Sequence, residues 1–322
     1  MVDEYANETG DFVSSTINPS PVLWPRGELI FQVFCLSLIM VIGIIGNGLV
    51  IVSVIISRQL RTVTNVYVVN LAVTDLLTVL NIPLTIIAML SDSNGWPLAD
   101  WLCVFTGASL VICVTSSIYT LAMIAISRLL VVTRSHVGNK SLPFKRHCII
   151  TALVFIWSIS IFMASIPAIF GVGQLGYDTR YYSSCTWDWS HSQSSTYNVI
   201  VAASLYPVPF LVIVTCYLII FRHFHKHTEK MMVHTNTITQ NLFYVVVVYV
   251  MCITPFVICL SVVPRGGSIK ATPYAAVILM INSCINPLIY AVKHPHFKGV
   301  FKSILTCDLK RIADRPHDIR NT

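Results

Sequence analysis

The stretch between Cys103 and Arg128 constrains the fold most strongly, because none of the residues between these two carries a charge. As an α-helix with about 1.5 Å rise per residue, it would be roughly 38 Å long, slightly more than the hydrocarbon core of a bilayer. The cysteine would then lie at one membrane face and the arginine at the other. We therefore expect a membrane-spanning helix around which the rest of the chain is arranged.

The composition extends this expectation to the whole chain. Of 322 residues, 55% are hydrophobic and only 11% are charged, about half the charge of a typical soluble domain. A backbone inside a bilayer finds no water to bond, so each apolar block must be helical. Seven blocks have spanning length: about 30–57, 65–90, 101–133, 148–170, 197–221, 238–263 and 272–292.

These blocks predict an all-α membrane protein, a bundle of seven transmembrane helices with a short amphipathic eighth helix on the cytoplasmic side. The eighth helix is expected in HPHFKGVFKSIL, directly after the last span. The predicted organisation is an extracellular tail, the bundle, the amphipathic helix and a cytoplasmic tail, at 1–29, 30–292, 293–307 and 308–322.

The charges between the blocks predict the orientation. With the amino terminus outside, only four basic residues lie in outer segments and the other seventeen lie inside, whereas nine acidic residues lie outside and four inside. This is the positive-inside pattern. It predicts a multi-pass protein of the plasma membrane with an extracellular amino terminus. Nucleic-acid binding is a poor explanation of the net charge of +7, since the basic residues lie between hydrophobic blocks.

Four residues at the ends of the spans or beyond them are candidates for covalent modification. Only Cys103 and Cys185, of ten cysteines, fall where an oxidising compartment reaches them, so we expect a disulfide, with two free thiols as the alternative. Asn7 begins a glycosylation sequon in the outer tail, where the alternative is an unmodified tail. Cys307 ends the amphipathic stretch, a context that fits palmitoylation as well as it fits an unmodified cysteine.

Polar residues inside the spans predict an ion site. Asp75 is the only acidic residue within a block, and it needs a cation, a proton or several hydrogen-bond donors. Amide and hydroxyl side chains lie at compatible depths in other blocks, so we expect a hydrated cluster that holds Na⁺; the alternative is a protonated Asp75 that joins helices by hydrogen bonds. The partners expected around Asp75 are Asn47, Ser117, Asn282, Ser283 and Asn286.

The chain resembles a rhodopsin-like (class A) G-protein-coupled receptor over roughly 30–307. The residues that carry the resemblance are Gly46-Asn47, LAVTD at 71–75, Trp96 before Cys103, Arg128, Trp157, Pro209 with Tyr217, Pro255, and Asn286-Pro287-Leu288-Ile289-Tyr290 followed by Phe297. The resemblance implies that Arg128, Tyr217, Pro255 and Tyr290 form the switch and the surface that couples to a heterotrimeric G protein.

The departures from the family pattern concern this switch. The usual acidic-Arg-Tyr triplet is Ser127-Arg128-Leu129 here, so Arg128 has no adjacent carboxylate. The usual Cys-Trp-x-Pro is Cys252-Ile253-Thr254-Pro255, without the aromatic residue. The foot of the sixth span has Thr235 and no acidic residue. We therefore expect a weakened restraint on Arg128 and raised signalling without ligand.

The resemblance also narrows the ligand. Leu110 stands where amine receptors have an aspartate, and Met280 stands where opsins have the lysine that binds retinal. The implied pocket is apolar with phenolic hydroxyls, which suits a small neutral or lipid-like molecule or the apolar end of a peptide, bound among the third, fifth, sixth and seventh spans. Its expected wall is Leu110, Val111, Val114, Tyr206, Phe256, Leu260, Tyr274 and Met280, with 181–189 as a lid.

Other functional classes are less well supported by the sequence. A transporter would need more charge in the membrane or two inverted halves, and no internal repeat is visible. No HExxH or G-x-S-x-G motif is present, and we expect neither enzyme activity nor a cofactor other than an allosteric Na⁺. A receptor-like scaffold that does not signal stays open because of the altered triplet. The expected partners are an extracellular ligand, a G protein and membrane lipids.

Overall fold

The computed structural model describes residues 25–91, 95–134, 146–178, 183–205, 207–226, 232–262 and 271–308. The side chains of 63, 134, 146, 224–226, 232–243, 245, 262 and 295 lie outside this description. Asn7 and Tyr206 also lie outside the described residues, as does almost all of the expected cytoplasmic tail.

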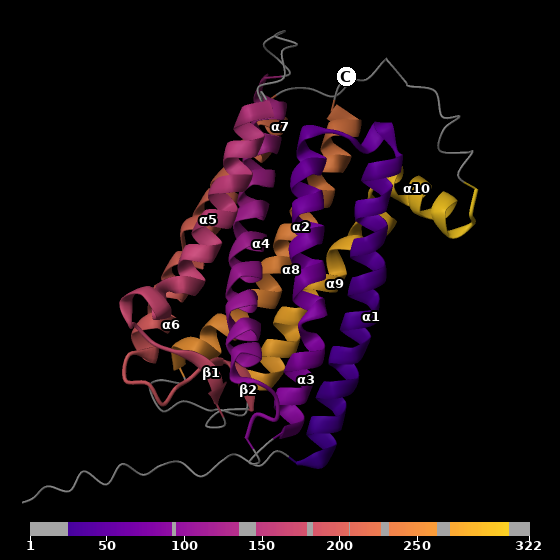
Figure 1. The fold of residues 1–322 in the computed structure, drawn as a ribbon. Coiled ribbons are helices and arrows are strands. Elements are labelled where there is room, and N and C mark those ends of the chain that lie inside the picture. The colour runs from indigo at the N-terminus through magenta and orange to yellow at the C-terminus, as the bar shows by residue number, and fades with distance from the viewer. Residues whose placement is uncertain are drawn as a thin grey trace, which may run out of the picture.

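The described chain is a bundle of long helices, as the apolar blocks predict (Figure 1). Six helical segments are long and apolar enough to cross a membrane, and a seventh apolar stretch covers 246–261 within α8 in the described residues. The spans are α1 (Arg26–Ile56), α2 with α3 (Val63–Leu80, Ile82–Ser91), α4 (Asp100–Arg134), α5 (Arg146–Phe170), α6 with α7 (Ser194–Leu205, Pro207–Lys226), α8 (Met232–Val262) and α9 (Thr272–Lys293).

The second span is interrupted at Asn81, which lies in a turn between α2 and α3. Pro83 follows two residues later and has no amide hydrogen to donate to the preceding turn. The backbone N–H of Asn81 donates to the carbonyl of Thr78, three residues earlier, at 3.2 Å. In a regular α-helix the acceptor would be the carbonyl four residues earlier. The proline therefore accounts for a kink in a span that the sequence predicts as one block.

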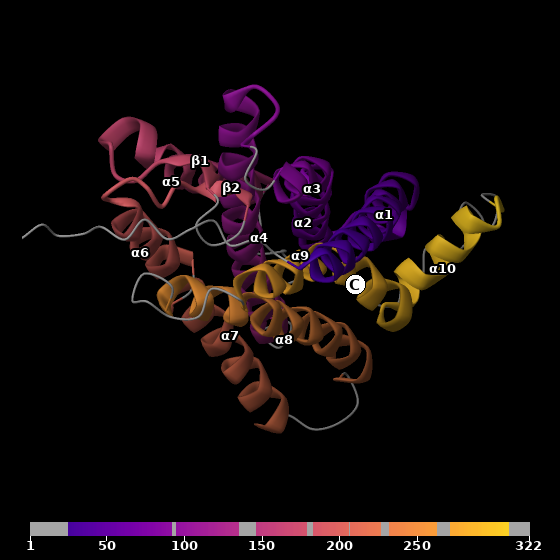
Figure 2. The same cartoon turned by 90° about the horizontal axis from the view of Figure 1, so that it is seen from below.

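The α4 helix lies in the centre of the bundle, packed against α2, α5, α7 and α8 (Figure 2). Its middle is joined to two neighbours by Asn70 on α2. The Asn70 amide nitrogen donates to Thr120 Oγ1 at 2.8 Å, and its oxygen accepts from Trp157 Nε1 on α5 at 3.0 Å. One buried amide thus fixes the relative positions of three spans, through one of its two N–H groups and its oxygen.

The outer loop after α5 forms a two-stranded antiparallel hairpin that the sequence does not predict. Strand β1 (Leu175–Asp178) pairs with β2 (Ser184–Trp187), and Tyr177 lies opposite Cys185. The Asp188 backbone N–H donates to the Gln174 carbonyl at 2.9 Å and closes the base of the hairpin, and the Trp189 backbone N–H donates to Asp178 Oδ2 at 2.8 Å. Trp187 is buried, with its ring centroid 6.3 Å from that of Tyr197 on α6.

A short helix, α10 (Pro295–Leu305), leaves the bundle after His294 and is the expected eighth helix. Phe297, Val300 and Phe301 are buried, whereas Lys298 and Lys302 are exposed, so the helix is amphipathic. The Phe297 ring stacks on Tyr290 at the end of α9, with centroids 5.5 Å apart. This contact fixes the direction in which α10 leaves the bundle.

Candidate functional site

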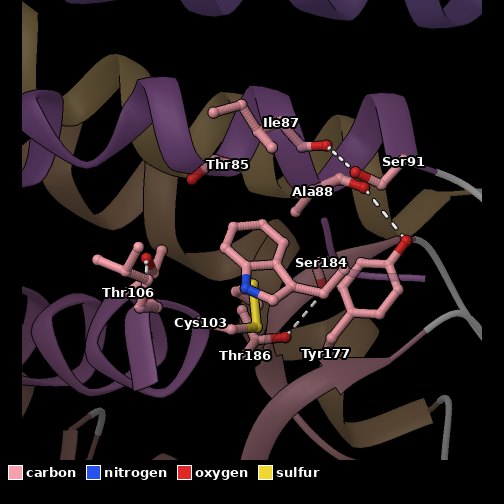
Figure 3. Close-up of a disulfide and its surroundings, with 12 residues drawn as sticks. Thr85, Ile87, Ala88, Ser91, Cys103, Thr106, Tyr177, Ser184 and Thr186 are labelled. Carbon is pink, nitrogen blue, oxygen red and sulfur yellow. Dashed lines mark hydrogen bonds between the residues drawn. A yellow bond between two sulfur atoms is a disulfide. The ribbon is translucent and has the colours of Figure 1, made fainter. Parts of the chain in front are cut away.

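The roof of the site is fixed by a disulfide between Cys103 at the head of α4 and Cys185 in β2, as the sequence predicts. The two α-carbons are 4.9 Å apart, and 82 residues of sequence separate them. Figure 3 shows the disulfide between the hairpin and the outer ends of α3 and α4. The Tyr177 hydroxyl donates to the Ala88 carbonyl at 3.4 Å, so the hairpin is joined to α3 as well as to α4.

Gly107 permits the hairpin to lie directly on α4. A β-carbon at this position would lie 3.3 Å from the carbonyl oxygens of Cys185 and Thr186, both of which are backbone atoms. The two backbones therefore approach more closely than almost any side chain would allow. One turn outward from Gly107 on α4 is Cys103, so the disulfide and the close backbone contact act on the same segment of β2.

A cavity opens beneath this hairpin, between α1, α2, α3, α4, α8 and α9. It measures about 690 Å³ when its open mouth is counted. The polar groups of its wall are hydroxyls and one amide, and no charged side chain lines it in the described part of the chain. The residues that line it are Leu36, Thr78, Asn81, Thr85, Met89, Thr106, Leu110, Ser184, Cys185, Thr186, Phe256, Pro273, Ala276, Val277, Leu279 and Met280.

Three of the predicted pocket residues line this cavity: Leu110, Phe256 and Met280. Val111 and Leu260 are buried in the helix core, and Val114 packs against that core. Tyr274 lies at the outer rim, where its hydroxyl donates to Glu28 Oε2 on α1 at 2.9 Å. The cavity therefore keeps the expected third, sixth and seventh spans, adds the first and second spans, and has no described lining residue from the fifth.

The sequence analysis missed the hydroxyl-bearing wall of the cavity, although a signal for it was present. Thr78, Asn81 and Thr85 follow a spacing of three and four residues, which places them on one side of a helix. Thr106 lies one turn outward from Leu110 on α4 and therefore on the same side of that helix. In contrast, nothing in the sequence indicates that Ser184 and Thr186 would reach the cavity from β2.

The polar cluster lies deeper in the bundle and joins α1, α2 and α9. The Asn286 amide nitrogen donates to Asp75 Oδ2 at 2.8 Å. The Asn47 amide nitrogen donates to the Ser283 carbonyl at 2.8 Å and to the Gly43 carbonyl at 3.0 Å. The Ser117 hydroxyl bonds to Thr74, the neighbour of Asp75 in sequence, at 3.0 Å.

Several oxygen atoms of this cluster are buried and have no hydrogen-bond donor among the described residues. They are Oδ1 of Asn47, Asp75, Asn282 and Asn286. Buried acceptors of this kind normally have a partner, because leaving them without one is costly. A carboxylate and three amide oxygens are a ligand set that suits a hard cation. The residues present therefore fit the Na⁺ that the sequence predicts.

The inner end of α4 carries Arg128, whose Nε is buried and donates to no described residue. The guanidinium is within electrostatic range of Tyr217 on α7 and Tyr290 on α9. The hydroxyl of Ser127 donates to the Ile124 carbonyl at 2.8 Å, within its own helix. No carboxylate pairs with Arg128 in the part of the chain that the structure describes.

Pro255 lies inside α8, and Ile253 is fully buried where the family usually has an aromatic residue.

Comparison with known proteins identifies the family. The family described as "7 transmembrane receptor (rhodopsin family)" matches residues 46–290 of this chain. The chain belongs to the rhodopsin family of seven-transmembrane receptors. This rhodopsin-family receptor is 30% identical to melatonin receptor type 1B-B of Danio rerio over 282 residues, which cover 83% of this chain and 79% of that protein.

Two further similarities agree with the family. The allatostatin-A receptor of Bombyx mori is 26% identical over 283 residues, covering 83% of this chain and 77% of that receptor. The crystal structure of squid rhodopsin superimposes with a TM-score of 0.77 at 21% identity, covering 92% of this chain and 94% of that chain. The latter similarity confirms the seven-helix fold. The chain is thus a signalling receptor of this family. Its helix α4 carries Cys103 of the disulfide, Leu110 in the wall of the cavity, and Arg128 at the inner end.

Proposed function

We propose that the receptor lies in the plasma membrane with its amino terminus outside, binds an uncharged extracellular ligand in the outer cavity and activates a heterotrimeric G protein at its inner face. The observation that carries the ligand class is the wall of the cavity, whose lining in the described chain holds no charge. The hydroxyls of Thr78, Thr85 and Thr106 donate to carbonyls of the preceding turn, so their oxygens face a ligand as acceptors. A small neutral or lipid-like molecule, or the apolar end of a peptide, would satisfy such a wall without burying an unpaired ion.

The ligand proposal is tested by filling the cavity. Leu110→Trp would occupy space between α4 and α9, whereas Leu211→Trp places the same ring on a side of α7 that is 62% exposed and faces lipid. Cells that carry a panel of Gα sensors are screened with libraries of neutral, lipid-like and peptide ligands. A hit on the wild type should lose at least tenfold in potency with Leu110→Trp and be unchanged with Leu211→Trp. Equal potency in all three would refute binding in this cavity.

The coupling proposal rests on Arg128 with Tyr217 and Tyr290 at the inner end of the bundle. A ligand that favours an open packing of the helices would turn α8 outward at Pro255 and free the arginine for the carboxy terminus of a Gα subunit. Arg128→Ala should therefore abolish nucleotide exchange on purified G proteins while ligand affinity remains. If the wild type itself drives no exchange with any G protein, the chain is a scaffold and the proposal fails.

The Asp75 cluster is proposed to hold Na⁺ in the inactive packing. Asp75, Asn47, Asn282 and Asn286 would contribute oxygen ligands, with Ser117 nearby. By linkage, Na⁺ would then lower agonist affinity. Asp75→Asn keeps the shape and removes the charge, so agonist affinity should become independent of Na⁺ when K⁺ replaces it at constant ionic strength. An affinity that stays equally sensitive to Na⁺ would contradict this site.

Two modifications are proposed beside these sites: glycosylation of Asn7 and palmitoylation of Cys307. Cys307 is exposed and follows the last turn of α10 with φ of 54°. Its backbone N–H bonds to the Ile304 carbonyl at 3.1 Å, and that of Asp308 bonds to the Ser303 carbonyl at 2.9 Å. This helix ending normally takes glycine, and the cysteine here presents its thiol beyond the helix. Hydroxylamine-sensitive acyl labelling that Cys307→Ser removes would support the proposal, and labelling that persists would contradict it.

A further inference from the structure

At the inner end of the bundle, from which α10 leaves, the charge of Arg128 has no acidic counterpart among the described residues (Figure 1). Its electrostatic neighbours are the phenols of Tyr217 on α7 and Tyr290 on α9. The only acidic residue within a span, Asp75, accepts a hydrogen bond from Asn286 and is not among these neighbours. From 189 to 307 the sequence contains a single acidic residue, at 229, which lies outside the described residues. Arg128 therefore needs a counter-ion that the described chain does not supply.

Two donors at this place have no acceptor among the described residues. Both Arg128 Nε and the Tyr290 hydroxyl are buried, and neither makes a hydrogen bond there. A guanidinium can only donate, and a phenol can rotate its O–H towards a nearby acceptor. A buried donor without an acceptor is costly, and a charge taken out of water without a partner costs more. A negatively charged acceptor would satisfy both groups, whereas a water molecule would accept the hydrogen bonds and leave the charge unbalanced.

The Tyr290 side of this site is held in place by two contacts. The Tyr290 ring stacks on that of Phe297, with centroids 5.5 Å apart. One turn earlier on α9, Pro287 packs on the backbone of α1, because a β-carbon at Gly46 would lie 2.8 Å from the proline ring. The hydroxyl of Tyr290 is therefore already positioned, and an acceptor that binds it gains affinity because the donor needs no ordering.

The inner face both admits and attracts a small anion. Arg128 is partly exposed as a whole residue although its Nε is buried, so an ion can reach it from the inner side. The inner segments carry seventeen basic residues against four acidic ones, which raises the local concentration of anions. The surroundings are closely packed, since Ile124 on α4 and Ile220 on α7 are only 1% and 0% exposed. The site therefore favours a monatomic anion over a larger one.

We propose that Arg128 and Tyr290 bind one chloride ion, which takes the place of the carboxylate that the family usually has beside this arginine. Arg128 donates to the ion through Nε, and Tyr290 donates through its hydroxyl. The ion neutralises the guanidinium and joins α4 to α9 in the inactive packing. It has to leave before the carboxy terminus of a Gα subunit meets the arginine. This last consequence rests on the coupling proposed above, whereas the binding site itself does not.

The test measures anion binding on the purified full-length receptor. Thermal unfolding is followed during titration with sodium chloride, sodium bromide or sodium gluconate at equal Na⁺ concentration and ionic strength, so that the Asp75 cluster is in the same state in every buffer. An ion that binds only the folded receptor raises the unfolding temperature. Chloride and bromide should raise that temperature of the wild type in a saturable way, and gluconate, which is much larger, should not.

Two variants change the donors themselves. Arg128→Gln removes the charge and should abolish the response to chloride. Tyr290→Phe keeps the ring that stacks on Phe297 and removes only the hydroxyl. The chloride concentration that gives half of the response should then rise about tenfold, as expected for one hydrogen bond to an ion.

Three further variants serve as matched comparisons. Ser127→Asp supplies a carboxylate of the chain and should make the unfolding temperature independent of chloride. Ser127→Asn, of similar shape and uncharged, should respond like the wild type. Arg58→Gln removes an exposed basic residue from the same inner end and should also respond like the wild type.

A second measurement follows the consequence for signalling. Replacement of chloride by gluconate should raise basal nucleotide exchange by the wild type and leave Ser127→Asp unchanged, a comparison that corrects for any effect of the anion on the G protein. If the wild type drives no exchange at all, the coupling proposal fails, and the unfolding temperatures still decide whether the anion site exists.

Four results would overturn the anion site. They are equal stabilisation by gluconate and chloride, a chloride response that survives in Arg128→Gln, an equal loss of response in Arg58→Gln, and a wild type that responds to none of the anions. The third would indicate general attraction to the basic inner face, and the fourth would indicate that water satisfies the two donors.

Discussion

The two ends of α4 are held in different ways. At the outer end, Cys103 is covalently bound to β2, and Gly107 lies in backbone contact with the same strand. At the inner end, Arg128 carries a charge that no described carboxylate neutralises, and the Ser127 hydroxyl donates to the Ile124 carbonyl of its own helix. The outer end of α4 is therefore held by a covalent bond and a close backbone contact, and the inner end has no restraint of comparable strength among the described residues.

This difference between the two ends of α4 assigns ligand binding to the fixed outer end and the change of conformation to the inner end. A ligand gains affinity when its site needs no ordering, and the disulfide, the hairpin and α3 form such a site around the cavity. A switch requires two packings that differ little in free energy, which a strong ion pair at Arg128 would oppose. We therefore expect substitutions at the outer end to change binding and substitutions at the inner end to change basal signalling.

The largest effect should come from releasing the outer end. Cys185→Ser removes a cross-link that spans 82 residues, worth about 4 kcal/mol in the chain-entropy model. The cavity would lose its roof, so surface expression and ligand binding should both fall strongly. Cys148→Ser, at a free and exposed cysteine, serves as the control. Flow cytometry and radioligand binding provide the measurements, and normal values in Cys185→Ser would contradict a fixed outer frame.

A smaller effect should follow from pushing the hairpin away from α4. Gly107→Val would place carbon atoms against the carbonyls of Cys185 and Thr186, with a cost of about 1–3 kcal/mol for forced packing. Ligand affinity should fall while the disulfide remains. At Gly48 an added β-carbon would meet nothing within 4 Å, so Gly48→Val serves as the control for the helix substitution itself. If both variants bind ligand like the wild type, the contact at Gly107 does not shape the cavity.

The smallest expected effect concerns the inner end. Ser127→Asp offers Arg128 a carboxylate, and a partly buried ion pair would favour the inactive packing by about 1 kcal/mol after desolvation. Basal nucleotide exchange should then fall several-fold at matched surface density, because the population changes tenfold per 1.4 kcal/mol. Ser127→Asn, of similar shape and uncharged, should leave it unchanged. Basal exchange near background in all three proteins would show that packing alone restrains Arg128.

Much of the fold follows from the sequence because the membrane leaves few alternatives. Uncharged blocks of spanning length have to be helices, and the charges between them give the order of their ends. The contact between Asp75 and Asn286 could also be predicted, since a buried acid must find a partner at its own depth. Cys103 and Cys185 could be paired because the remaining cysteines lie in spans or on the inner side.

The position of the cavity could not be obtained in this way. It depends on the kink at Asn81, on the hairpin register that turns Ser184 and Thr186 inward, and on Trp187 and Tyr197 filling space near α6. These features result from packing between segments far apart in sequence, and periodicity within one block carries no information about them. The hairpin itself also escaped prediction, because its two strands are only four residues long.

The contact between Gly46 and Pro287 has a mechanical consequence. A β-carbon at Gly46 would lie 2.8 Å from the ring of Pro287, so the backbone of α1 packs directly on the proline ring of α9. A rigid helix that tilts about one point of contact moves its two ends in opposite directions. If α9 tilts against α1, this contact is the fulcrum, and a displacement of Met280 towards a ligand is reversed at Tyr290, on the far side of Pro287.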